Sequence, residues 1–233
     1  MDPPTIALTF DDLFARNWHA ARPVFDEFGA RVSFCVSHLH KARPRQIARL
    51  RALQDDGHEI GCHSRTHPRL EPYLARHGLA HWLAHEIDAA IAEHRALGFP
   101  AASFASPFHA STPETRAETG KRFAVTRAAG PRGLEPENLA ARIYRRLGPD
   151  RAVDCLGFCD FQHSAFPGWD WQMRLLDTIA ETGGTGVFAG HDIRGPGKRS
   201  EFYSTPEDLR RFLGAARDRG LGFVTLSEVG GGM

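Results

Sequence analysis

The sequence alternates short β-prone runs with helix-like runs along almost its whole length. Residues 5–10 form an apolar, β-prone run, and residues 18–28 carry apolar side chains at helical spacing before Gly29. The alternation continues as far as a last β-prone run at 222–226. Because a helical crossover returns the chain to a parallel neighbouring strand, this order predicts a parallel sheet or barrel covered by helices.

Several further elements follow from the same patterns. We expect strands at 31–36, 59–62, 102–105, 123–126, 153–158 and 185–189, and helices at 75–97, 136–147, 168–182 and 206–219. No internal repeat, low-complexity tract or linker interrupts them, so we expect a single catalytic domain over 1–233. In such folds the chemistry lies on loops that leave the C-terminal ends of strands.

Composition excludes several classes of function. The 29 basic and 28 acidic residues give a net charge of +1, which offers no basic surface for nucleic acid. No apolar run approaches the ~20 residues of a membrane span, and the first residues lack the features of a secretory signal. We therefore expect a cytoplasmic protein without nucleic-acid or membrane partners, in which Cys35, Cys62, Cys155 and Cys159 are reduced. The oligomeric state does not follow from the sequence.

Polar side chains cluster where four of the expected strands end. Asp11 and Asp12 follow the first strand, and His63 and His67 follow the third. Pro107 and Phe108 come after the fourth strand, and His191 follows the strand at 185–189. Each cluster alone also fits an ordinary turn or cap. Together, at the ends of parallel strands, they predict one site at a barrel mouth.

Histidine is abundant, with 13 in 233 residues, but not every histidine belongs to that site. His77, His81 and His85 repeat the four-residue spacing of His63 and His67. They lie roughly opposite the apolar positions of their own expected helix, so we interpret them as a solvated face.

At the four strand ends the chain resembles the polysaccharide deacetylases of carbohydrate esterase family 4, the NodB-homology domain. Residues 9–12 read TFDD, as in the family's first motif, and residues 63–67 match its second, H-[ST]-x-x-H. The resemblance covers nearly the whole chain and implies a distorted, incomplete (β/α) barrel with about seven parallel strands. It also implies a metal-dependent hydrolase that removes an acetyl group from an N-acetylated sugar or a related small amide.

The resemblance assigns roles to individual residues. Asp11 is then the catalytic base, and Asp12, His63 and His67 are the metal ligands. His191 is the general acid. One carboxylate and two imidazoles suit Zn²⁺, and also Co²⁺, Ni²⁺ or Fe²⁺. The Phe108 backbone amide is expected to face the oxyanion.

Three motifs depart from the family pattern. The third motif has Ala105 in place of its arginine but keeps Pro107, and the fifth has Ala189 in place of leucine, which widens the acetyl pocket. The fourth, D-x-x-[DN]-W, survives as Asp170-Trp171. The arginine's role then falls to Arg65, Arg194 or the metal, and Asp192 is a doubtful partner for His191. We expect the following residues to line the substrate cleft, with a core position as the equal alternative for the aromatic ones: Pro107, His163, Trp169, Asp170, Trp171 and Ala189.

Two other functions remain open on the same scaffold. One is hydrolysis of another small amide or cyclic imide, which the missing arginine, Ala189 and the lack of a signal peptide favour. The other is a non-catalytic family member that binds a metal or a carbohydrate. The expected partner in every case is a small-molecule or oligosaccharide ligand.

Overall fold

The computed structural model describes residues 3–131, 134–197 and 200–231. The strands are β1 (Pro4–Asp12), β2 (Ser33–Val36), β3 (Glu59–Cys62), β4 (Ser103–Ala105), β5 (Val125–Ala129), β6 (Ile143–Tyr144), β7 (Ala152–Asp154), β8 (Gly157–Phe158), β9 (Gly184–Gly190), β10 (Asp192–Ile193), β11 (Tyr203–Ser204) and β12 (Gly222–Val224). The α-helices are α1 (Ala15–Ala20), α2 (Arg22–Phe28), α3 (Pro44–Asp55), α4 (Leu70–His77), α5 (Leu79–Trp82), α6 (Ala89–Ala96), α7 (Pro113–Gly120), α8 (Trp169–Thr182) and α9 (Pro206–Asp218).

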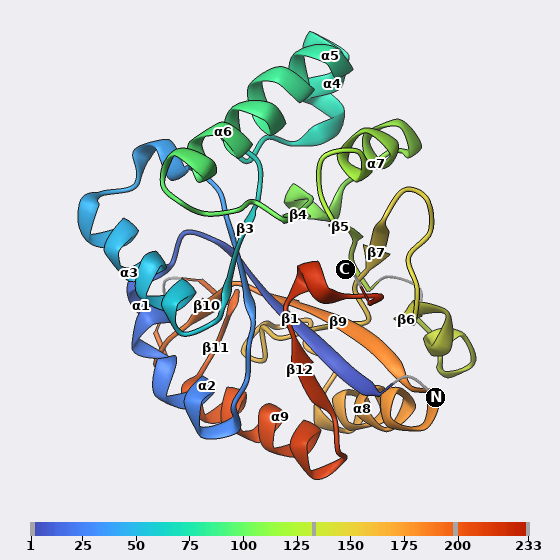
Figure 1. Cartoon of the computed structure of the whole chain (residues 1–233). Coiled ribbons are helices and arrows are strands. Elements are labelled where there is room, and N and C mark those ends of the chain that lie inside the picture. The colour runs from blue at the N-terminus through green and yellow to red at the C-terminus, as the bar shows by residue number, and fades with distance from the viewer. Residues whose placement is uncertain (1–2, 132–133, 198–199, 232–233) are drawn as a thin grey trace.

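Ten of these strands form one sheet that curls into a nearly closed barrel. Its order is β6-β9-β1-β2-β3-β4-β5-β7, with β12 paired to β1 and β8 paired to β9. Every pairing in it is parallel except that of the short β6 with β9. Figure 1 shows β1 beside β9 in the middle of the molecule, with the helices around the outside. The expected distorted (β/α) barrel is confirmed.

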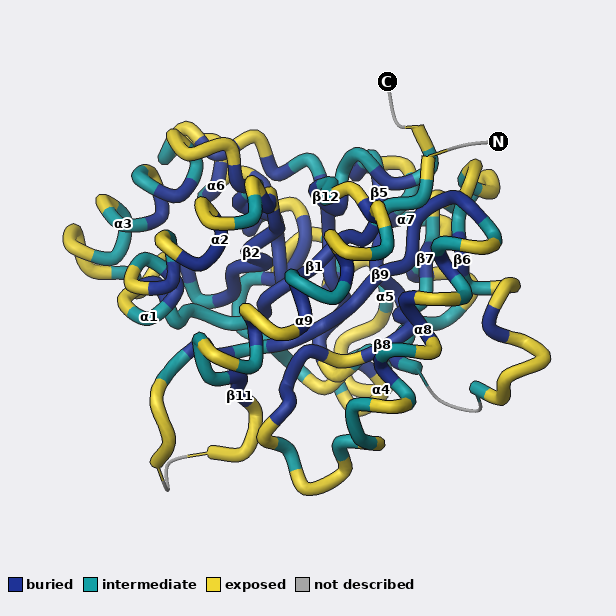
Figure 2. The backbone as a smooth tube through the Cα atoms, turned by 90° about the horizontal axis from the view of Figure 1, so that it is seen from below, coloured by how far each residue is buried: buried dark blue, intermediate teal, exposed yellow. Residues whose placement is uncertain are grey.

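The alternation of side chains along β1 separates an outer core from the barrel interior. Ile6, Leu8 and Phe10 belong to the large apolar cluster under the helices, whereas Ala7 belongs to a smaller cluster inside the barrel. Figure 2 shows the strands buried and the outer turns of the helices exposed. By the same alternation, Asp11 points into the barrel at the end of the strand.

Two expected helices are wrong in part. The helix expected at 75–97 breaks at Gly78, which has a φ of 78°, and passes through a π-helical segment at Leu83–Asp88. The helix expected at 136–147 is a 3₁₀ helix over Pro136–Arg142, after which the chain pairs with β9 as β6. Pairing with the sheet edge outweighs the helical pattern there.

The strand expected at 153–158 is divided into β7 and β8, which pair with β5 and β9 respectively. Two further predictions agree with the described part of the chain. The four cysteines are free and buried, and the histidines at 77, 81 and 85 are exposed. No helix in the ranges that the structure describes is long and apolar enough to cross a membrane.

The largest fully buried side chain, Trp18, links the outer core to the mouth of the barrel. Its indole ring lies 4.9 Å from that of Phe34, and its Nε1–H donates a 2.8 Å hydrogen bond to the backbone carbonyl of His191. The packing of α1 therefore holds the backbone that follows β9.

We expect Trp18→Phe to lower the free energy of unfolding by about 2 kcal/mol, because it opens a cavity and removes the hydrogen bond to the half-buried His191 carbonyl. Urea unfolding measures the change. Trp82→Phe is the matched control, since Trp82 is also buried but its indole makes no hydrogen bond to another described residue. An equal loss in both variants would contradict a role for the hydrogen bond.

Candidate active site

The three predicted metal ligands come together at the ends of β1 and β3. One ligand atom from each of Asp12, His63 and His67 lies within 4.8 Å of the other two. Nε2 of His67 is 3.6 Å from Oδ1 of Asp12, and the ring centroids of His63 and His67 are 4.8 Å apart. Among the described residues this is the one such group of three or more His, Cys, Asp or Glu side chains.

The turn after β3 is held in an unusual conformation that brings its two histidines together. Ser64 and His67 have φ values of 60° and 55°, and Ser64 Oγ accepts a 3.0 Å bond from the His67 N–H. The buried Glu86 carboxylate accepts the Thr66 N–H at 2.7 Å and its hydroxyl at 2.6 Å. These bonds from the helical segment over residues 83–88 hold His67 toward Asp12.

The chemistry of these donors fits a divalent metal. His63 Nδ1 lies 2.7 Å from the carbonyl oxygen of Ala105, which can only accept, so Nδ1 carries the proton and Nε2 presents its lone pair. Burial lowers the pKa of His63 to about 4, which keeps the ring neutral as a ligand must be. Three protein ligands leave a further coordination position open.

A buried arginine from β5 pairs with Asp11. Arg127 is fully buried, and its guanidinium donates to Asp11 Oδ2 and, at 3.1 Å, to Nδ1 of His109. Burial disfavours the charged form of Asp11, but Arg127 and the neighbouring imidazoles outweigh burial and hold the pKa of Asp11 well below its ordinary value. The other carboxylate oxygen, Oδ1, is buried without a hydrogen-bond partner among the described residues.

Arg127 supplies, next to Asp11, the guanidinium that the third motif lacks at position 105. The two residues are register partners on neighbouring strands, so the guanidinium enters from one strand further along the sheet. Arg65 pairs instead with Glu93 at 2.7 Å, and Arg194 pairs with Asp192 at 3.3 Å. The sequence signal that could have identified Arg127 is its position as a lone charged residue within an apolar, β-prone run.

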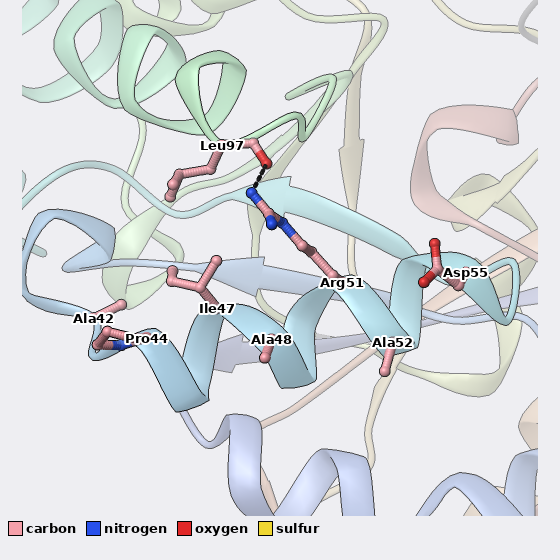
Figure 3. A pocket seen from close by; sticks show the side chains of 8 residues that line it. All are labelled: Ala42, Pro44, Ile47, Ala48, Arg51, Ala52, Asp55 and Leu97. Atoms are coloured by element: carbon pink, nitrogen blue, oxygen red, sulfur yellow. Dashed lines mark hydrogen bonds between the residues drawn. The ribbon is translucent and has the colours of Figure 1, made fainter.

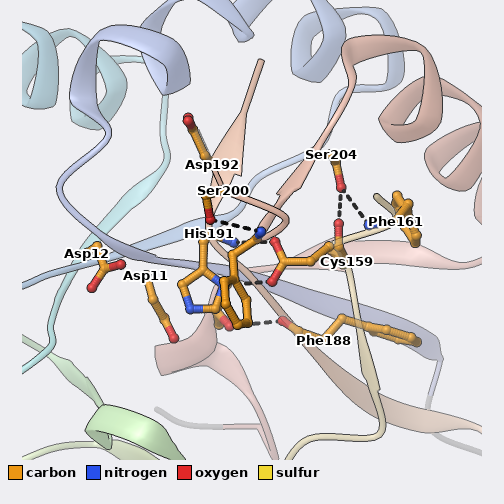
Figure 4. Close-up of polar contacts among 12 residues, drawn as sticks. Asp11, Asp12, Cys159, Phe161, Phe188, His191, Asp192, Ser200 and Ser204 are labelled. Carbon is orange, nitrogen blue, oxygen red and sulfur yellow. Dashed lines mark hydrogen bonds and ion pairs between the residues drawn. The ribbon is translucent and has the colours of Figure 1, made fainter. Parts of the chain in front are cut away.

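His191 has a carboxylate partner that the sequence analysis missed. Asp160 accepts the His191 backbone N–H at 2.9 Å and lies 2.6 Å from its Nδ1. Burial opposes protonation, but the hydrogen bond and charge of Asp160 outweigh it and raise the pKa of His191 to about 9. Figure 4 shows the His191 ring beside Asp11, with Nε2 as the nitrogen left free of Asp160.

Asp160 stands just after the end of β8. Its place at a strand end was the signal that could have identified it. Asp192, the other candidate partner, receives hydrogen bonds from Asn17 at 2.8 and 3.1 Å and belongs to a different contact.

The residues expected in the substrate cleft divide into two groups, apart from His163, whose ring lies 4.6 Å from that of Phe202. Pro107 is buried next to Phe108, whose ring is 4.6 Å from that of His67, and Ala189 is buried in register with Phe158 of β8. The second group, Trp169, Asp170 and Trp171, begins α8.

The two indole rings of α8 pack against the apolar core. Trp169 lies 4.7 Å from Phe161 and beneath the guanidinium of Arg211, and Trp171 lies by Arg174. In the part of the chain described, neither ring contacts the predicted metal ligands, and Asp170 is exposed. The core position, the alternative left open for these aromatic residues, is the one their contacts support.

A separate hollow lies on the outside of the barrel. Figure 3 shows it between α3 and the end of α6, where Ile47, Arg51 and Leu97 are among its lining residues. None of the residues at the barrel mouth contributes to it.

The arrangement at the mouth suits acid–base hydrolysis. Asp11 is kept ionised and able to accept a proton, whereas His191 is kept protonated and able to donate one. Two titratable groups whose environments move their pKa values in opposite directions divide the roles of base and acid between them.

Comparison with solved structures identifies several chains with the same fold. A family 4 carbohydrate esterase from Streptomyces lividans, solved with acetate, is 15% identical, with a TM-score of 0.57 over 96% of this chain and 93% of that one. The peptidoglycan deacetylase PdaC from Bacillus subtilis is 16% identical, with a TM-score of 0.54 over 97% and 89%. The polysaccharide deacetylase Bc1974 from Bacillus cereus is 13% identical, with a TM-score of 0.56 over 95% and 91%.

The sequence comparisons add the family. No curated protein matches the chain significantly in sequence. The family model described as polysaccharide deacetylase matches residues 1–122, a span that contains Asp11, Asp12, His63 and His67. Since this match covers more than half of the 233 residues, the chain belongs to the polysaccharide deacetylase family.

Proposed function

We propose that the chain is a divalent-metal-dependent hydrolase that removes an acetyl group from an N-acetylated sugar or a related small amide, and that residues 1–233 form one catalytic domain. The observation that carries this proposal is geometric: Asp11 pairs with Arg127 and His191 pairs with Asp160, at the same barrel mouth as the Asp12, His63 and His67 cluster. Family membership supports hydrolysis of a carbon–nitrogen bond.

In this proposal Asp12, His63 and His67 hold the metal, with Zn²⁺ as the first candidate for this donor set. When bound, the cation polarises the acyl carbonyl and lowers the pKa of a water molecule at the same centre.

The chain's own residues move the protons. Asp11 receives the proton of the attacking water at Oδ1, because Arg127 already occupies Oδ2. His191 then donates the proton on Nε2 to the departing amine, while Asp160 holds Nδ1. The Phe108 amide is the proposed donor to the oxyanion, since its residue lies against His67.

The acyl group is proposed to lie over Ala189, next to His191. Ala189 precedes His191 by two residues, which places both on the same side of the chain. Phe158 is its register partner and points to the same side of the sheet. A small residue next to a large one leaves room for a short acyl group.

A carbohydrate substrate is supported by the fold neighbours, whose names are those of a carbohydrate esterase and of peptidoglycan and polysaccharide deacetylases. The alternative of a small amide or cyclic imide drew support from the missing arginine at 105. Arg127 removes that support, because a cation does contact the base.

The proposal is tested by acetate release from N-acetylglucosamine oligomers and small N-acetyl amines, and by formation of the ring-opened acid amide from cyclic imides. We expect turnover to stop with EDTA, to return with Zn²⁺ or Co²⁺, and to fall by about 10²-fold or more in Asp11→Asn while the bound metal is retained. Metal content per chain is the control. Full turnover by Asp11→Asn, or wild-type protein that is metal-loaded but inactive on the whole panel, would contradict the proposal.

The role of Arg127 is tested with two variants, one that removes its guanidinium and one that places a guanidinium on the neighbouring strand instead. Arg127→Met leaves Asp11 buried and unpaired, so we expect loss of about 3–5 kcal/mol of stability and of most activity. The double variant Ala105→Arg/Arg127→Met returns a guanidinium from the neighbouring strand, and we expect it to regain at least about tenfold in kcat/KM over Arg127→Met. Activity in Arg127→Met equal to that of the wild type would refute the assignment.

The pairing of Asp160 with His191 predicts a change in pH dependence. His191 donates only while it is protonated, so activity falls as the pH rises through its pKa, which Asp160 raises to about 9. Asp160→Asn removes the charge that raises this pKa, so we expect the alkaline limb of kcat/KM to move to lower pH. The displacement between wild type and variant, at fixed metal loading, is the measured quantity. An unmoved limb would show that another group sets it.

A further inference from the structure

The exposed large apolar side chains of the described residues all lie around the active site. They are Phe108, Phe158 and Phe202, which are 46%, 36% and 50% exposed. Each contacts a histidine of the site or next to it: His67, His109 and His191 respectively, with ring centroids 4.6, 5.5 and 5.2 Å apart. Exposed aromatic rings gathered at a reaction centre indicate a surface that a ligand covers.

Of these three rings, Phe202 is the one that contacts His191, the proposed acid. The amine must lie next to His191, which protonates it, and Phe202 meets the His191 ring edge-on. Phe108 instead lies by the metal ligand His67, and Phe158 lies in register with Ala189 beneath the acyl group. The group bound to the amine nitrogen therefore extends over Phe202.

The position of Phe202 is set before any ligand binds. Phe202 directly precedes β11, in which Tyr203 is the register partner of Asp192 in β10. The backbone carbonyl of Phe202 accepts the Asp192 N–H at 3.4 Å. Its ring also lies 4.6 Å from that of His163, whose backbone N–H donates to the Asp160 carbonyl at 3.0 Å. Phe202 and His163 thus form an aromatic wall tied to the elements that hold His191.

We propose that this aromatic wall, Phe202 with His163, binds the ring of an amino sugar face-on beside His191, an inference that rests on the proposed function. A pyranose ring presents several C–H bonds on one face, and the negative face of an aromatic ring attracts them. An acyclic amine offers no such face. The wall therefore selects ring-bearing N-acetyl substrates over acyclic ones of the same acyl group.

The first test is binding without turnover. Isothermal titration calorimetry of the full chain in EDTA, with N,N′,N″-triacetylchitotriose as ligand, compares the wild type with Phe202→Ala and Phe202→Trp. We expect the dissociation constant to rise about tenfold in Phe202→Ala and to stay within about twofold of wild type in Phe202→Trp. Unchanged affinity in Phe202→Ala, or no binding of the trisaccharide by the wild type, would overturn the inference.

Tyr73→Ala is the matched control. Tyr73 also contacts two histidines, His77 and His81 at 5.0 and 5.8 Å, but it belongs to α4 and lies outside the site. We expect its affinity for the trisaccharide and its turnover to equal those of the wild type.

The second test uses the zinc-loaded enzyme on two substrates. For triacetylchitotriose, we expect Phe202→Ala to lower kcat/KM about tenfold, mainly through KM, while N-acetylputrescine changes by less than about twofold. Equal losses on both substrates would show that Phe202 acts only through His191. If the trisaccharide binds through Phe202 but no acetate is released, the hydrolase proposal fails and the sugar-binding wall stands.

Discussion

The buried ion pair between Arg127 and Asp11 is the interaction on which the site depends. Both side chains are almost fully removed from solvent, and either charge alone would be strongly destabilising there. The pair forms only if β1 and β5, which are not neighbours in the sheet, face each other across the barrel interior. Closure of the barrel and ionisation of the proposed base therefore depend on the same contact.

A second ion pair, between Asp160 and His191, raises a pKa, whereas the pair of Arg127 with Asp11 lowers one. Arg127 stabilises the deprotonated form of Asp11, and Asp160 stabilises the protonated form of His191. Trp18 adds a hydrogen bond to the His191 carbonyl from the outer core, so side chains on both sides of the barrel wall position this residue. The proposed base and the proposed acid thus each have a charged partner before any substrate binds.

Two motif positions hold alanine, and in both cases the neighbouring strand carries a larger side chain in register. Ala105 pairs with Arg127, and Ala189 pairs with Phe158. Register partners in a parallel sheet point to the same face, so a group can reach the same region from either strand. A motif that is incomplete along the chain can therefore be complete in space, as the contact of Arg127 with Asp11 shows.

The sequence by itself determined the alternation of strands and helices, and the strand ends at which Asp11, Asp12, His63, His67 and His191 stand. These features are local, because hydrophobic period and turn residues are encoded within a few positions. Only the tertiary structure decided the partners. Asp11 meets an arginine 116 residues away, and His191 meets a carboxylate 31 residues away. Such contacts depend on strand register and barrel closure, which no local pattern specifies.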